Sequence, residues 1–123
     1  MNPLDSLSDR DLLELAAKAA GLKIYAARQA ERDAAIDPAT ASLWLTSGHT
    51  AWNPGTNNSD ALSLAVKLNM AISIHDHHCM ACAQTGTMQT VSKHGTTAES
   101  TRRAIVLAAA DVGMAMVLAE RGT

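Results

Sequence analysis

The chain of 123 residues contains no phenylalanine, and its only aromatic side chains are two tryptophans and one tyrosine. Because 47% of the residues are hydrophobic, the core must be built from Ala, Leu, Ile, Val and Met, which lets helices and strands approach closely. The length suits one domain with its own core. We therefore expect a single domain over residues 1–123, in which each aromatic side chain is a candidate for a specific role.

The chain also lacks a strong charge of either sign, with a formal net charge of -2 at pH 7. Nucleic-acid binding needs a basic stripe, and the only adjacent basic pair is Arg102-Arg103, so nucleic acid is not an expected partner. No run approaches the roughly 18 apolar residues of a membrane span, and the start has no signal-peptide pattern. Two cysteines three residues apart are too few for a disulfide framework, which favours a cytoplasmic location.

Local signals mark the ends of the expected helices. Ser8 is a good N-cap before an apolar stripe that stops at Gly21. Thr96 and Glu99 form a capping box before a long apolar run. Asn69 can end a middle helix in a left-handed conformation. These signals predict three well-separated helices, one at each end of the chain and one in the middle.

Alternating apolar residues between these helices predict strands. The expected strands cover residues 22–28, 43–46, 70–75 and 79–93, the last one bent or divided at Gly86. Residues 31–40 are expected to form a polar connection. The resulting order, α-β-β-α-β-β-α, favours an α+β fold with an antiparallel sheet sandwiched by helices. The last helix either ends at Gly113 or continues into a helical extension over residues 114–123.

A candidate binding site surrounds the turn that precedes the middle helix. An exposed indole there would stack on a ring, amides would hydrogen-bond it, and two guanidinium groups near a helix start would hold an anion. The candidate ligand-binding residues are Trp52, Asn53, Asn57, Asn58, Arg102 and Arg103. The alternative is purely structural: Trp52 plugs the junction of sheet and helix, the asparagines cap the helix, and both arginines pair with Glu99.

A second cluster could hold a metal ion. Its candidate ligands are His75, His77, Cys79 and Cys82, of the types that zinc prefers. The two cysteines would point to opposite faces if they lie on a strand, and no second Cys/His pair exists elsewhere, so we favour no metal and no cofactor. A nucleophile with an activating base is not evident, and His49 is the only loop candidate for a general base, so the sequence favours a non-enzymatic protein.

Three segments, about half of the chain, carry a family resemblance. The first is Leu12-Leu13-Glu14-Leu15-Ala16-Ala17-Lys18-Ala19-Ala20-Gly21. The second comprises Trp52-Asn53-Pro54, Thr56, Asp60-Ala61-Leu62 and Leu64-Ala65-Val66-Lys67-Leu68. The third comprises Thr101-Arg102-Arg103-Ala104-Ile105-Val106, Ala108-Ala109-Ala110 and Gly113. Together they resemble small phage and prophage proteins with the phage ABA sandwich domain. The resemblance implies a helix–sheet–helix fold and a phage origin, but the family offers no established catalytic residues to transfer.

The expected function is therefore that of a small phage-encoded binding protein in the cytoplasm of the host cell. Its expected ligand is a nucleotide-type signal of host immunity, which it would sequester. One alternative is an inhibitor or adaptor that binds a host protein through a helical face and the apolar tail. Another is a zinc-binding protein built on residues 75–82. The apolar side chains Met114, Met116, Val117 and Leu118 also raise the prospect of a homo-oligomer.

Overall fold

The computed structural model of the protein describes residues 3–37, 42–46 and 50–122. In chain order the elements are the 3-10 turn η1 (Pro3–Ser6), α1 (Asp9–Ala19), α2 (Ala26–Ala35), β1 (Leu43–Leu45), β2 (Thr50–Trp52), α3 (Asn58–Lys67), β3 (Ala71–Ile74), β4 (His78–Cys82), β5 (Gln89–Ser92) and α4 (Thr97–Arg121). β1 and β2 form an antiparallel pair, and β3, β4 and β5 form a three-stranded antiparallel sheet. The predicted α+β class is confirmed.

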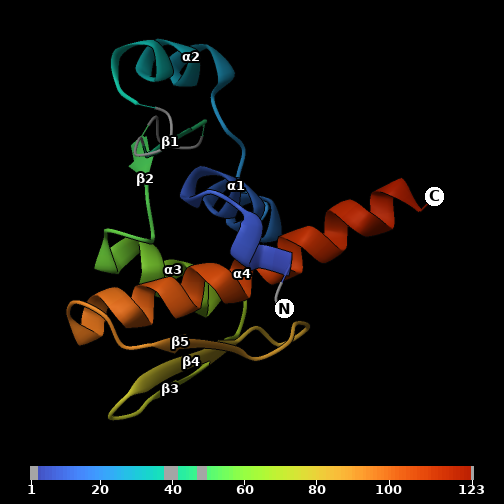
Figure 1. The fold of residues 1–123 in the computed structure, drawn as a ribbon. Coiled ribbons are helices and arrows are strands. Elements are labelled where there is room, and N and C mark those ends of the chain that lie inside the picture. Colours follow the sequence, from blue (N-terminus) through green and yellow to red (C-terminus); the bar gives the residue numbers. More distant parts are fainter. Residues whose placement is uncertain (1–2, 38–41, 47–49, 123) are drawn as a thin grey trace.

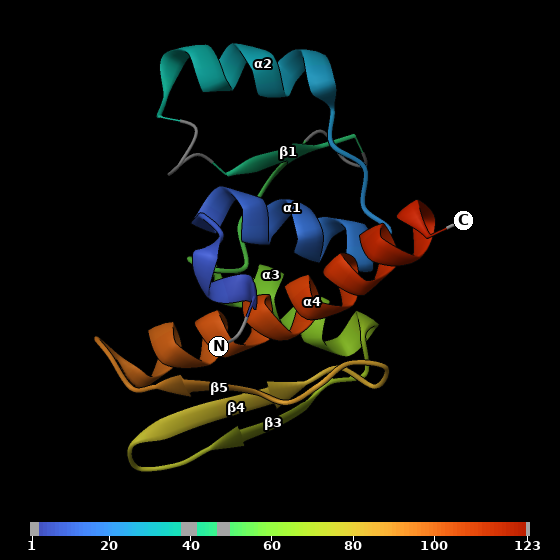
Figure 2. The ribbon, with the colours of Figure 1, turned by 45° about the vertical axis from the view of Figure 1, so that its right-hand side comes forward.

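The long helix α4 occupies the middle of the molecule, with the three-stranded sheet on one side and α1 on the other (Figures 1 and 2). Every residue of α4 from 104 to 110 is buried, so all sides of these two turns are covered. Most of those residues are alanines, and small side chains let α1, α3 and the sheet all approach the same helix. The absence of phenylalanine from the chain fits this close packing.

Gly113 lies where α4 crosses α1. A Cβ atom at this position would overlap the backbone carbonyl oxygen of Leu15, so only glycine lets the two helices come this close. The glycine therefore serves helix packing rather than helix termination. α4 continues through it to Arg121, which decides between the two alternatives that the sequence left open.

The three-stranded sheet has one covered and one open face. Cys79 and Ala81 of β4 are both 0% exposed, on the face that α4 covers. Thr90 and Ser92 alternate with buried residues along β5 and are exposed on the other face. Within the described residues the helices thus lie on one side of this sheet (Figure 2), so the expected enclosure by helices on both sides is not seen.

The predicted strand over residues 22–28 is wrong in its second half. Ile24 makes one isolated bridge to Leu45, but a helix, α2, starts at Ala26 and occupies much of the expected polar connection. The alternation that predicted the strand was short, and it runs into a stretch of Ala, Arg, Gln and Glu, all strong helix formers. The observed order therefore has an additional helix and an additional strand.

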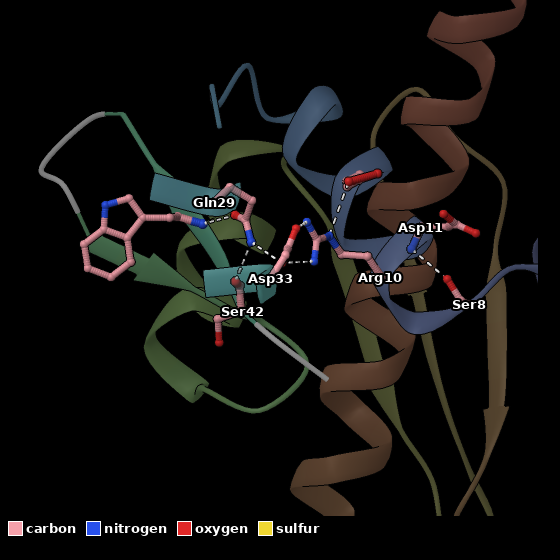
Figure 3. A network of polar contacts seen from close by, with 8 residues as sticks. Ser8, Arg10, Asp11, Gln29, Asp33 and Ser42 are labelled. Carbon is pink, nitrogen blue, oxygen red and sulfur yellow. Dashed lines mark hydrogen bonds and ion pairs between the residues drawn. The ribbon is translucent and has the colours of Figure 1, made fainter. Parts of the chain in front are cut away.

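A network of polar contacts ties α2 to α1 and β1 (Figure 3). Arg10 of α1 donates two hydrogen bonds of 3.0 Å to the two carboxylate oxygens of Asp33 in α2. Gln29, only 5% exposed, donates to Asp33 and to the carbonyl oxygen of Ser42, and it accepts a hydrogen bond from the backbone N–H of Trp44. This network takes the place of an apolar core, because Gln29 is the buried residue of α2.

The local signals at the helix ends are confirmed. Ser8 and Thr96 accept hydrogen bonds from the backbone N–H groups of Asp11 and Glu99, respectively. Asn69 follows α3 with φ at 50°, in the left-handed region. None of the helices within the described residues has the length and apolar character needed to cross a membrane.

The substitution Gly113→Ala should destabilise the protein strongly. The added methyl group meets the backbone of α1 rather than a flexible side chain, so the two helices must move apart, and overpacking of this kind costs about 1–3 kcal/mol. Urea denaturation followed by circular dichroism measures the loss. Gly122→Ala, at the end of α4, is the matched control and should change the free energy of unfolding little; equal effects of both substitutions would contradict the proposed packing role.

Asp33 should make the stability of the protein depend on pH. The hydrogen bonds from Arg10 and then from Gln29 lower the pKa of the Asp33 carboxyl below its ordinary value. Because the pKa of Asp33 is lower in the folded state than in the unfolded state, the ionised carboxylate stabilises the fold at pH values above the unfolded-state pKa. This stabilisation is lost as the pH falls through the folded-state pKa. Thermal unfolding between about pH 4 and pH 2 should therefore show a steeper loss in the wild type than in Asp33→Asn or Arg10→Gln. Superimposable profiles would contradict this role.

Candidate functional site

A hollow of about 540 Å³ lies against the first three turns of α4. Its walls come from α4, from the beginning of α1 and from the loop that leads into α3. The lining residues are Asp9, Leu13, Asn53, Gly55, Thr56, His94, Glu99, Arg102, Arg103 and Val106. We call it the α4 hollow. A volume of several hundred Å³ is typical of sites for small ligands.

Three helices begin around the α4 hollow. Ser8 caps α1, Asn57 caps α3 and Thr96 caps α4, each by accepting one backbone N–H of the first turn. The remaining N–H groups of a first turn have no partner within their helix, and the helix dipole adds partial positive charge there. The convergence of three helix starts therefore favours a negatively charged group in this region.

Arg102 projects from the second turn of α4 toward the loop before α3. Its Nε atom donates to the carbonyl oxygen of Gly55 at 3.0 Å, and its Nη1 atom donates to Oδ1 of Asn58 at 2.7 Å. Both acceptors are neutral, so these contacts orient the guanidinium group without compensating its charge. Within the described residues Arg102 has no carboxylate partner.

Arg103 has a carboxylate partner, but an exposed one. Its Nη1 atom lies 2.8 Å from Oδ1 of Asp9, and the side chains of the two residues are 35% and 76% exposed. Ion pairs in such exposed positions contribute about 0–1 kcal/mol. Asp9 can therefore exchange its place beside Arg103 with a ligand anion at little cost.

The α4 hollow is not uniformly basic. Glu99 lies one turn before the arginines, and its carboxylate accepts a hydrogen bond from the Thr96 hydroxyl at 3.3 Å. His94 borders the same end, with its Nδ1 atom 3.1 Å from the carbonyl oxygen of Ser92. Leu13 and Val106 provide an apolar floor. The hollow thus combines a cationic centre, hydrogen-bonding groups and apolar surface.

The structure brings part of the predicted ligand site together. Asn53, Arg102 and Arg103 line the α4 hollow, and Asn58 lies behind Arg102 as its hydrogen-bond acceptor. Asn57 is the N-cap of α3, as the structural alternative proposed, with Oδ1 accepting from the N–H of Asp60. The same alternative also expected both arginines to pair with Glu99, but their hydrogen bonds go elsewhere.

Trp52 is placed in the core rather than at the ligand site. It is 5% exposed, so it offers no open ring face for stacking, and its position matches the interpretation of a plug at the junction. The aromatic ring that does lie near arginines is Trp44, with the guanidinium carbons of Arg28 and Arg32 at 5.2 and 5.1 Å from its ring centre. Tyr25 lies with it at a shallower hollow of about 350 Å³.

Sequence reasoning missed several residues of the α4 hollow. Asp9 has only the sequence signal of a charge in the first turn of a helix, His94 has none, and Glu99 is predicted only as part of the capping box with Thr96. Nothing local to these positions points to a shared site. Gly55 lies between two residues of the recognised segment, but its approach to Arg102 depends on how α3 packs on α4.

The four candidate metal ligands are not brought together. Cys79 is 0% exposed and lies under α4, where its sulfur accepts from the hydroxyl of Thr101 at 3.4 Å. Cys82 points to the opposite face of β4, as its strand position predicts, and its thiol contacts the carbonyl oxygens of Ala83 and Gly86. Within the described residues no group of three His, Cys, Asp or Glu side chains is arranged to hold a metal ion.

One hydroxyl and one imidazole meet on the open face of the sheet. Ser73 Oγ lies 2.7 Å from Nε2 of His75, whose ring stacks on that of His78 at a centroid distance of 4.5 Å. Neither Ser73 nor His75 lines the α4 hollow, and acyl-transfer chemistry needs an enclosed site with donors for the developing charge. His49, the loop candidate for a general base, lies outside the described residues. The α4 hollow is the better-supported site.

Comparison of the chain with protein-family models, with curated proteins and with solved structures found no match. The resemblance to phage ABA sandwich proteins therefore stays a prediction. The function has to be argued from the geometry of the site.

The two cysteines should differ in reactivity toward Ellman's reagent. Cys79 is fully covered by α4, whereas Cys82 is partly accessible on the open face, and both thiols are free. The native protein should therefore react at about one thiol per chain, and the unfolded protein at both. Cys82→Ser should abolish the reaction of the native protein. Equal reaction of both thiols in the native state would contradict the placement of Cys79.

Proposed function

We propose that the protein is a non-enzymatic binding protein that holds a small phosphate-bearing ligand in the α4 hollow. The observation that carries this proposal is Arg102, a half-buried guanidinium group oriented by two neutral oxygens. Burial of a charge favours its pairing with an opposite charge. A ligand anion would supply the missing partner.

The geometry leaves Arg102 with donors to spare. A guanidinium group has five N–H donors, and the contacts with Gly55 and Asn58 use two of its nitrogen atoms. The remaining donors suit phosphate oxygens, which arginine binds in a planar, two-pronged arrangement. Arg103 lies next to it and can join by leaving its exposed partner Asp9.

The other lining residues favour a ligand with more than a phosphate. Leu13 and Val106, 5% and 3% exposed, close the bottom of the hollow with apolar atoms, and Asn53 and Thr56 offer polar edges. A nucleotide combines these properties. The narrower proposal, a nucleotide-type host immune signal sequestered by a phage-encoded protein in the host cytoplasm, rests on the resemblance to small phage proteins and not on a motif.

A second candidate function is that of an inhibitor or adaptor that binds a host protein. The observation that favours it is the end of α4, where Met116 and Leu118 are 39% and 58% exposed. Exposed apolar side chains on a helix can pack against a partner protein, and methionine adapts to irregular surfaces. This function uses another surface than the α4 hollow, so the two candidates can be separated experimentally.

Isothermal titration calorimetry with a panel of phosphate-bearing ligands tests the first proposal. The panel comprises nucleoside monophosphates, cyclic dinucleotides and ADP-ribose derivatives. For a ligand that binds, Arg102→Gln should weaken the affinity at least about tenfold, because a hydrogen bond to a charged group contributes about 1.5–3 kcal/mol. Arg28→Gln removes a guanidinium group outside the α4 hollow and is the matched control, with no expected change.

Two outcomes would contradict the ligand proposal: no heat with any member of the panel, or unchanged affinity in Arg102→Gln. The second candidate would be favoured if the protein captured one stoichiometric partner from host lysate. The Met116→Ser, Leu118→Ser double variant should then lose this partner, and Arg102→Gln should keep it.

A further inference from the structure

β3 is an edge of the three-stranded sheet. The strand order in this sheet is β3-β4-β5, and within the described part of the chain no strand pairs with β3 on the side away from β4. Figure 2 shows β3 along the border of the sheet that lies farthest from α4. An edge strand presents a row of backbone N–H and C=O groups that can bond to another strand.

The hydrogen-bond pattern shows which residues of β3 face the free edge. The N–H of His75 donates to the carbonyl oxygen of His78 at 2.9 Å, so this pair is of the hydrogen-bonded type. Such pairs alternate along an antiparallel ladder, which makes Ser73 with Met80 the next one. Ile72 and Ile74 therefore direct their N–H and C=O groups away from β4, toward the free edge.

The side chains of the same two residues form an apolar strip beside that edge. Ile72 is paired with Ala81 and Ile74 with Cys79, and paired residues point to the same face. Cys79 and Ala81 are 0% exposed beneath α4, whereas Ile72 and Ile74 are 40% and 56% exposed. The helix layer that covers β4 thus leaves the inner face of β3 incompletely covered.

β3 is short, but it lacks the charged and proline residues that often protect an edge strand. Its sequence, Ala71-Ile72-Ser73-Ile74, contains neither a charged residue nor a proline. Exposed edges in monomeric proteins commonly carry lysine, proline or a bulge, because an unprotected apolar edge pairs with other chains. Both the backbone and the side chains of β3 are therefore suited to receive a further strand.

We propose that β3 pairs antiparallel with β3 of a second copy of this chain, about a two-fold axis at Ser73. This register places Ile72 of each copy opposite Ile74 of the other, with all four residues in hydrogen-bonded pairs and their side chains on one face. A register centred on Ile72 would need the N–H of Met70, which already donates to the carbonyl oxygen of Ala65 at 2.9 Å. The two sheets join into one continuous sheet.

Charge does not oppose this arrangement. The four residues of β3 are neutral. Antiparallel pairing about Ser73 places Asp76, in the turn after β3, opposite the neutral Met70 of the other copy. No like charges therefore meet along the paired strands.

The contact is small. An edge of four residues is about 13 Å long, and pairing over this length covers less than the roughly 800 Å² per partner of a standard stable interface. Interfaces of this size are typical of transient association, so we expect a dimer that dissociates on dilution.

Site-directed cross-linking tests the register directly. Ser73 faces Ser73 of the second copy in a non-hydrogen-bonded pair, whose Cβ atoms lie about 4.5–5.5 Å apart, close enough for a disulfide after a small adjustment. In a Cys82→Ser background, Ser73→Cys should give a covalent dimer on mild oxidation. Two matched controls should stay largely monomeric: Thr90→Cys, exposed on the same open face but on β5, and Ile74→Cys, which faces Ile72.

Sedimentation velocity tests the association itself. The wild type should rise from 12.9 kDa toward twice this mass with increasing concentration. Ile72→Pro removes an N–H that faces the free edge, so it should keep the monomer at all concentrations while circular dichroism shows an intact fold. Ile74→Lys should act likewise, and Thr90→Lys should not.

Three results would overturn the proposal. They are a wild type that stays monomeric at several hundred micromolar, equal cross-linking of Ser73→Cys and Thr90→Cys, and a dimer that persists in both Ile72→Pro and Ile74→Lys. The last result would point to another surface, such as the exposed end of α4.

Discussion

The close approach of α1 to α4 positions most of the molecule. It depends on the alanines around residues 104–110 and on Gly113, where the backbone of α1 leaves no room for a side chain. With α4 held between α1 and the sheet, its first turns are oriented so that Arg102 contacts the loop before α3 and Arg103 contacts the start of α1. The α4 hollow is therefore a consequence of helix packing, because its walls come from α4, from the start of α1 and from the loop that leads into α3.

Two arginines differ in whether the fold compensates their charge. Arg10 meets both oxygens of Asp33, so its charge is compensated within the fold and the contact joins α1 to α2. Within the described part of the chain Arg102 meets neutral oxygens alone, so its orientation is determined while its charge remains uncompensated. This difference, rather than the number of basic residues, distinguishes a candidate ligand site in a chain with a net charge near zero.

The three-stranded sheet is covered unevenly, and this makes its edge distinctive. α4 buries the inner residues of β4 and β5, but Ile72 and Ile74 of β3 share that face and stay partly exposed. Only a helix layer that reached across β3 on this same inner face would have buried these two residues. The uneven cover connects the fold to the inferred dimer, because the same two residues expose both apolar side chains and backbone groups.

The sequence by itself determined the features that depend on neighbours along the chain. These are the caps at Ser8 and Thr96, the left-handed residue Asn69 and the opposite orientations of the two cysteines on one strand. Only the tertiary structure decided that Trp52 is buried, that Gly113 packs rather than ends a helix, and that Arg102 contacts the neutral oxygens of Gly55 and Asn58. Burial and pairing are set by segments distant in sequence, and local periodicity carries no information about which segments meet.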